Sequence, residues 1–309
     1  MVLASAEPLD IHLPWQDRLD WFVDNALAPL SHTLEQLAPA AWGSTPPRLP
    51  LLLSLPPPRP GVPPDTTTQL VRRIAGALPL PVDRGRSVMV RSGHDGALCC
   101  LGAAVDLLAI DQPMAVIVGG VDSWLAIEAL HWLEAQRRLK CATAPKGIVP
   151  GEGAAFLLLV NDAFASLANV QSNVVVLAQA RAVEPNPWYG ERPCLAEGLT
   201  RALRSLLERP EHRVRTDLTL GDLNGEPWRA QEWAFAYLRT HTLHSEPLNL
   251  WHPADLWGDT GAAASALLTA LAAYELSRDP LLERAVLWSA SDVTPYRSAA
   301  LLAAKRRMM

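Results

Sequence analysis

The stretch GHDGALCCLGAA, from Gly93 to Ala104, predicts a helix that is buried on all sides. Every residue after Asp95 is small or apolar, and a helix without a polar face belongs in the middle of a large core. The start of such a helix is a favoured place for a nucleophile. Here it carries His94 and Asp95, and the two cysteines follow too late to occupy the first turn. The residues at this helix start therefore bear directly on which chemistry the chain can perform.

Strands and helices are predicted to alternate on both sides of this helix, which indicates an α/β fold with mainly parallel sheets covered by helices. The order of elements repeats once, so we expect an internal duplication with halves 1–165 and 166–309 and one buried small-residue helix in each. In the first half we expect strands at 49–55, 87–92, 114–120 and 147–160, and helices at 14–37, 66–78, 93–104 and 124–139. In the second we expect strands at 173–180, 216–225, 248–253, 284–290 and 298–304, and helices at 195–209, 226–240 and 260–276.

Composition and charge exclude several classes of protein. The net charge of −5 and the few basic runs argue against nucleic-acid binding, because neutralising phosphates supplies most of that affinity. No stretch reaches the roughly 18 apolar residues of a membrane span. The four cysteines form no CxxC pair. We therefore expect a cytoplasmic protein without disulfides, bound neither to nucleic acid nor to a membrane.

Three further motifs carry a resemblance to a known family. They are VGGVDSWL at 118–125, GIVPGEGAAFLLL at 147–159 and WGDTGAAASALL at 257–268. In this order they resemble the thiolase-like fold and, within it, the beta-ketoacyl synthases, from about Leu49 to the end of the chain. The resemblance implies two duplicated βαβαβαββ halves, whose two mostly parallel sheets enclose the buried helices.

The same resemblance implies that each half starts with a strand inside its sheet. The second half has NVVVLAQA, but only MVLASAEPLDIHL, interrupted by Pro8, precedes the first helix. A missing inner strand would leave buried backbone groups unpaired. Residues 1–5, an upstream segment or a strand from a partner could satisfy them, and we favour an upstream segment.

The residues at the family's catalytic positions are not the catalytic types. The cysteine nucleophile falls on His94 when aligned on GALCCLGAA, or on Asp95 when counted from Gly119. Cys99 and Cys100 lie inside the helix, away from the helix-start amides that depress a thiol pKa, and are expected to be buried small hydrophobes.

The family's other catalytic groups are also replaced. The motif that carries its first histidine is DLNGEP here, which places Asp222 at that position and Asn224 beside it. The second histidine falls on Asp259 and the lysine on Ala254. Claisen condensation needs a thiolate to hold the acyl group and imidazoles to stabilise the developing anion. We therefore expect no catalytic residue and no condensation.

Two interpretations of these positions remain. His94, Asp222 and Asp259 could meet in one pocket and bind a metal or transfer protons. We favour helix capping by Asp95 or Ser92 and by Asp259, with no metal and no cofactor. Four glycines could shape a ligand pocket, but tight turns and close packing are the more common reasons for glycine: Gly119, Gly120, Gly151 and Gly153.

The motifs around GGVDSWLAIEALHWLEAQRRL, GDLNGEPWRAQEWAF and HPADLWGDTGAAA resemble thiolase-like proteins of type VI secretion effector clusters. This resemblance implies an adaptor or chaperone that binds an effector. The alternative is a non-catalytic partner of an active synthase, similar to a chain-length factor, and a third is an enzyme with changed chemistry at His94, Asp222 and Asp259. The family implies a dimer, homo- or heterodimeric, through the strand SVMVRS.

Overall fold

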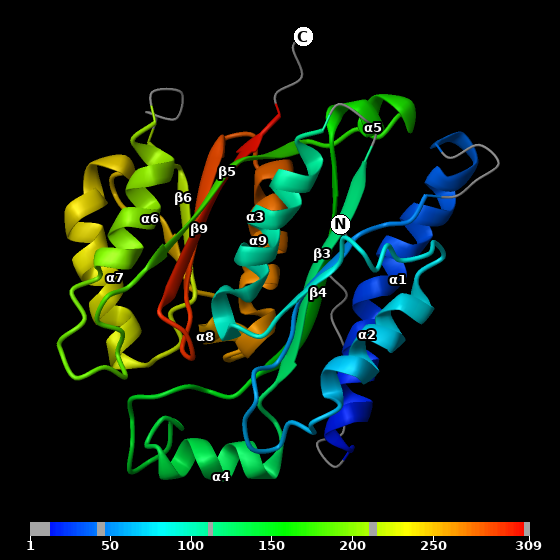
Figure 1. Cartoon of the computed structure of the whole chain (residues 1–309). Helices are drawn as coiled ribbons and strands as arrows, with labels where there is room; N and C mark the ends of the chain where they lie inside the picture. The colour runs from blue at the N-terminus through cyan, green and yellow to red at the C-terminus, as the bar shows by residue number, and fades with distance from the viewer. Residues whose placement is uncertain (1–12, 42–46, 111–113, 210–214, 306–309) are drawn as a thin grey trace.

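The computed structural model describes residues 13–41, 47–110, 114–209 and 215–305. Two β-sheets lie face to face with a pair of helices between them, and further helices cover the outer face of each sheet (Figure 1). The layers therefore alternate helix, sheet, helix, sheet, helix, which confirms the predicted fold class.

The first sheet has four strands in the described residues, in the order β2-β1-β3-β4. The strands are β1 (Leu51–Ser54), β2 (Val88–Val90), β3 (Ala115–Ser123) and β4 (Glu152–Val160). β1 runs parallel to β2 and β3, and β4 runs antiparallel to β3. β1 and β3 are buried along their whole length because helices cover both faces of the sheet.

The second sheet has five strands in the order β5-β9-β8-β6-β7. They are β5 (Val174–Val183), β6 (Leu218–Gly221), β7 (Leu250–Trp251), β8 (Arg284–Ala290) and β9 (Tyr296–Ala304). β6 is parallel to β7 and β8, whereas β9 is antiparallel to both β8 and β5.

A comparison of the sheets corrects one expectation. β2, β1, β3 and β4 correspond to β7, β6, β8 and β9, and β5, the first strand of the second half, pairs only with β9. The prediction that the first strand of a half lies inside its sheet is therefore wrong: it forms an edge. Residues 1–5 lie outside the described residues, so no described strand occupies the position beside β4 that β5 occupies beside β9.

The stretch that begins at Gly93 forms a short 3-10 turn, η1 (Gly93–Asp95), followed by α3 (Gly96–Leu108). Its counterpart is η4 (Gly261–Ala263) followed by α9 (Ala264–Arg278). α3 and α9 pack on each other and on both sheets, and the small residues of these helices permit that close approach.

The outer helices bury apolar stripes against the sheets. α1 (Trp15–Ala41) and α2 (Thr66–Ala77) cover the first sheet, and α6 (Glu197–Leu207) and α7 (Pro227–Thr240) cover the second. The remaining helices are short: α4 (Ile127–Ala135), α5 (Asp162–Leu167), α8 (Ala254–Trp257) and η3 (His241–Leu243). Among the helices that the structure describes, none has both the length and the apolar character needed to span a membrane.

Candidate functional site

His94 lies in η1, at the point where the chain leaves the carboxyl end of β2 and enters α3. Gly93 permits this turn because its φ is +68°, and a Cβ there would stand 2.3 Å from Oδ1 of Asp292. The His94 side chain is buried between the two sheets, with 1% of the residue exposed. This position is therefore an internal one, closed to solvent.

Both ring nitrogens of His94 are bound by carboxylates. Nε2 lies 2.8 Å and 3.0 Å from the two oxygens of Asp259, and Nδ1 lies 3.1 Å from Oδ1 of Asp292. Asp259 also accepts hydrogen bonds from the Trp124 indole at 3.1 Å and from the backbone N–H of Gly261 at 2.7 Å. The imidazole is thus held in place from both sides and has no nitrogen left for another partner.

Four more charged side chains extend this site: Arg138, Asp222, Glu226 and Arg229. Together with His94, Asp259 and Asp292 they form what we term the buried charge network. Arg138 donates to Glu226 at 2.6 Å and to Asp292 at 3.3 Å. Arg229 donates to Asp222 at 2.7 Å. All seven side chains are at most 9% exposed. The network alternates cations and carboxylates, so nearly every buried charge has an opposite neighbour.

Asp222 does not meet His94. Its Oδ2 accepts from Arg229, from the Ser289 hydroxyl at 2.6 Å and from the backbone N–H of Ala290 at 2.9 Å. The suggested three-residue pocket is therefore only partly formed: His94 and Asp259 are in contact, and Asp222 is bound to Arg229 instead. Asn224 lies on the His94 side and donates to Asp259.

Asp95 points away from His94. It accepts hydrogen bonds from Ser92, from Arg181 at 3.2 Å and from Ser298 at 3.0 Å. Neither Asp95 nor Ser92 makes a side-chain capping bond to the helix start, so that part of the capping interpretation is wrong. Asp259 does bond the backbone N–H of Gly261 at the start of η4. His94, and not Asp95, therefore contacts Asp259.

The network fixes the protonation of its members. Burial and the nearby Arg229 lower the pKa of His94, but the carboxylates of Asp259 and Asp292 outweigh them and raise it to about 10. Burial raises the pKa of each of these two carboxyls, but the charge of His94 holds the pKa of both well below the usual range. The two carboxylates on either side of the ring therefore favour the imidazolium form of His94.

The cysteines of α3 supply no substitute nucleophile. Burial raises the pKa of the Cys99 thiol and, more strongly, that of the fully buried Cys100 thiol. The reactive form of cysteine is the thiolate, which burial in apolar surroundings opposes. Ala254, at the family's lysine position, begins α8 and has no ionisable group.

At three of the four glycines, Gly119, Gly120 and Gly151, the neighbours pack too closely for a Cβ, and at Gly153 only the end of the Leu267 side chain would have to move. A Cβ would stand 2.3 Å from the Phe156 ring at Gly119 and 2.8 Å from the Ala262 carbonyl at Gly120. At Gly151 it would stand 2.4 Å from the Trp257 carbonyl, and at Gly153 3.2 Å from Leu267. Close packing accounts for them without a ligand.

One cluster in the described residues has the geometry of metal ligands, namely Glu184, Cys194 and Glu232. Glu232 is bound through both oxygens to Arg297, and Glu184 accepts from the backbone N–H of Gly198 at 2.8 Å. Burial and Glu232 raise the pKa of Cys194 to about 12. A protonated thiol and two engaged carboxylates do not suit a metal ion, so we assign none here.

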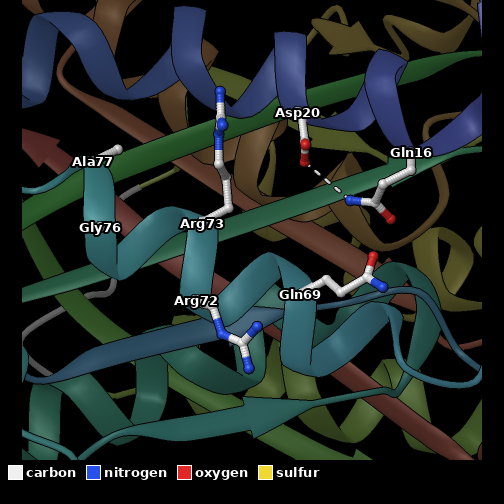
Figure 2. A pocket seen from close by; sticks show the side chains of 7 residues that line it. All are labelled: Gln16, Asp20, Gln69, Arg72, Arg73, Gly76 and Ala77. Atoms are coloured by element: carbon white, nitrogen blue, oxygen red, sulfur yellow. Dashed lines mark hydrogen bonds between the residues drawn. The ribbon is translucent and has the colours of Figure 1, made fainter.

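A hollow of about 510 Å³ lies on the surface between α1 and α2 (Figure 2). Seven residues from the two helices line it, and five of them have polar or charged side chains: Gln16, Asp20, Gln69, Arg72, Arg73, Gly76 and Ala77. Arg73 forms an exposed ion pair with Asp24. This hollow lies on the outer side of the first sheet, whereas the buried charge network lies between the sheets.

Sequence reasoning missed Asp292, Arg138, Glu226 and Arg229. A signal existed for Asp292, because it closely follows the buried strand β8, as Asp222 follows β6. The carboxyl ends of parallel neighbours lie at the same edge of a sheet. Arg138 and Arg229 lack such a signal, because arginines in amphipathic helices are usually exposed.

No family model matches this chain, and no curated protein matches it. Solved structures match it in fold. A ketosynthase from module 6 of the bacillaene synthase of Bacillus subtilis 168 aligns with a TM-score of 0.71 and 14% identity, over 96% of this chain and 59% of that one. A beta-ketoacyl synthase from Burkholderia phymatum STM815 aligns with a TM-score of 0.69 and 13% identity, over 98% and 87%.

The ishigamide ketosynthase/chain length factor aligns with a TM-score of 0.57 and 18% identity, over 85% of this chain and 75% of that one. The chain spans 57% and 59% of the two bacillaene synthase ketosynthase chains that it matches. At these identities the comparisons show a shared thiolase-like, ketosynthase fold.

Proposed function

We propose that this chain is a non-catalytic protein with a ketosynthase fold, which acts in the cytoplasm by binding another protein. The observation that supports this most directly is the position of His94, where the family's nucleophile would stand. Its imidazole is protonated and bound to two buried carboxylates. A cation without a free electron pair cannot form an acyl intermediate.

The surroundings of His94 also oppose condensation. That reaction develops negative charge on a thioester oxygen, and enzymes stabilise it with hydrogen-bond donors or cations. Asp259 occupies the family's second-histidine position and is ionised. Its charge would repel the developing anion, and the Trp124 and Asn224 donors that might serve the anion are already bound to Asp259.

The partner that we propose is a type VI secretion effector, with this chain as its adaptor or chaperone. The support for this partner is the sequence resemblance described above. A second candidate function is that of a chain-length-factor-like subunit of an active synthase. The fold match to the ishigamide ketosynthase/chain length factor favours that candidate.

Intact mass spectrometry tests the absence of catalysis. The full chain is incubated with acyl-CoA and with an acylated carrier protein, beside an active ketosynthase as the positive control. We expect an unchanged mass for this chain, and stoichiometric acylation of any residue would overturn the proposal. A repeat with divalent metals and hydrolysis assays tests changed chemistry at His94, Asp222 and Asp259.

The two partners are distinguished by direct binding. The purified chain is mixed in turn with the effector and spike proteins encoded beside its gene, and with any ketosynthase and acyl carrier protein encoded there. Size-exclusion chromatography with light scattering then gives the mass of each complex. A complex with the effector supports the adaptor function, a complex with a ketosynthase supports the second candidate, and no complex overturns both.

A further inference from the structure

The Arg229 side chain is fully buried, yet only one of its three nitrogens makes hydrogen bonds within the described residues. Nη1 donates to Asp222 and to the Ala290 carbonyl, each at 2.7 Å. Nε lies 3.6 Å from Oε2 of Glu226, which is too far for a hydrogen bond. Nε and Nη2 therefore have no acceptor in the part of the chain that the structure describes.

Three more buried polar atoms beside Arg229 have no partner among the described residues: Oδ1 of Asp222, Nε1 of Trp228 and Nε1 of Trp288. The carbon of the Arg229 guanidinium lies 4.3 Å from the centre of the Trp228 ring. A Cβ at Gly221, the residue before Asp222, would stand 2.5 Å from Nε1 of Trp288. The unpaired atoms therefore adjoin one ion pair, where α7 meets the carboxyl ends of β6 and β8.

The rest of the buried charge network is more completely paired. Every carboxylate oxygen of Glu226, Asp259 and Asp292 accepts at least one hydrogen bond from a side chain. Oδ1 of Asp222 is the one carboxylate oxygen of the network without a donor among the described residues. The unpaired atoms are thus a local feature of the Asp222–Arg229 pair.

Buried polar atoms of this kind need partners. A buried donor or acceptor that stays unpaired loses its hydration without compensation, and the loss is larger for a charged group. Folded proteins therefore pair nearly all such groups, and ordered water supplies the partner where no protein atom does. The unpaired atoms beside Arg229 accordingly indicate a site for a small hydrogen-bonding ligand.

The charges around this site indicate which ligand it takes. Even with His94 counted as a cation, the network holds four carboxylates and three cations, and an anion would add to that excess. A cation would face the N–H groups of Arg229 and of two indoles, and would meet one unpaired carboxylate oxygen. Water has no net charge and both donates and accepts, so it suits the whole set of atoms.

We propose that ordered water molecules are held beside Arg229 and bridge its guanidinium to Oδ1 of Asp222 and to the indole N–H groups of Trp228 and Trp288. Each water would donate to the carboxylate and accept from the guanidinium or an indole. The site lies where α7 covers the second sheet, whereas His94 lies between the two sheets. It is a property of this core and does not depend on the proposed protein-binding function.

Nuclear magnetic resonance of the full chain, with a nitrogen isotope in the tryptophan indoles, tests the proposal. Rotating-frame transfer from water to an indole proton reports a bound water beside it, and its sign distinguishes this transfer from proton exchange. We expect dipolar transfer to the indole protons of Trp228 and Trp288. Trp124 is the internal control, because its Nε1 donates directly to Asp259 at 3.1 Å and should show no such transfer.

The three indole signals are assigned by the loss of one signal in each of Trp124→Phe, Trp228→Phe and Trp288→Phe. A crystal structure of the unmodified chain, at a resolution that shows ordered water, keeps the test independent of these variants. We expect water oxygens at about 2.7–3.2 Å from Arg229 Nη2 and from Asp222 Oδ1.

Four results would overturn the inference. The first is the absence of transfer to Trp228 and Trp288, or of water density beside Arg229. The second is equal transfer to Trp124, which would show general hydration of the core. The third is density that follows the concentration of chloride, which would show an anion. The fourth is a direct contact of Arg229 Nε or Nη2 with a carboxylate, which would leave water no role.

Discussion

His94 and Asp259 are 165 residues apart in the chain and meet in the core, with Nε2 of His94 2.8 Å from Oδ1 of Asp259. His94 lies at the start of the first buried helix and Asp259 just before the start of the second. The contact is a buried ion pair between the two halves of the chain. Its energetic consequences can be measured without knowing the partner.

Alkaline pH should destabilise the protein through His94. Its pKa is about 10 when folded, against about 6.5 when unfolded. The stabilisation is fully present below pH 6.5, and it is lost as the pH rises through the folded pKa. Urea unfolding between pH 6 and pH 10 should show a progressive fall in the free energy of unfolding. His94→Gln is the control, and an equal fall in that variant would contradict the assignment.

Removing the imidazole should be costly at neutral pH. His94→Ala leaves Asp259 and Asp292 without their shared cation, and breaking a buried pair in this way costs about 3–5 kcal/mol. The matched control is His252→Ala, because the ion pair of His252 with Asp255 is largely exposed and should contribute less than about 1 kcal/mol. Urea unfolding at pH 7 compares the two. Similar losses would show that the buried charge network is not a main source of stability.

Much of the fold could be predicted because apolar periodicity reports local structure. The runs around Leu51–Ser54 and Ala115–Ser123 are continuous and apolar, as strands covered on both faces must be. The place of β5 at a sheet edge could not be predicted, because strand order depends on contacts distant in sequence. The site was harder still: Asp222 binds Arg229, and nothing in the sequence of α7 shows that this arginine points inward.

The cysteines should differ sharply in alkylation. The Thr143 hydroxyl lowers the pKa of Cys141, whereas burial raises the pKa of Cys99 and Cys100. Iodoacetamide at pH 7.5 should therefore modify Cys141 first and leave Cys100 unmodified in the folded chain. Peptide mass spectrometry over a time course measures the order. Early modification of Cys99 would contradict this order and indicate an accessible thiol in α3.

The chain should form a dimer through β2, either with itself or with a related subunit. β2 is the other edge of the first sheet, and Val88 is 41% exposed there. The Val90 carbonyl accepts from Leu55 at 2.9 Å, so by alternation the backbone of Met89 faces outward. Met89→Pro should therefore abolish pairing across this edge and leave the bonds to β1 intact. Met89→Leu, the matched control, should leave the dimer unchanged.

Light scattering at micromolar concentration measures the effect. A dimer that becomes a monomer only in Met89→Pro agrees with the prediction. A monomeric unmodified chain that also forms no complex with a related subunit contradicts it, as does a dimer that persists in Met89→Pro.

The buried charge network draws its members from both halves of the duplicated chain. His94 and Arg138 come from the first half, and Asp222, Glu226, Arg229, Asp259 and Asp292 come from the second. A charge change in one half therefore leaves an unbalanced buried charge in the other half. Single substitutions at residues 94, 259 and 292 should therefore be tolerated less well than matched changes at two of them.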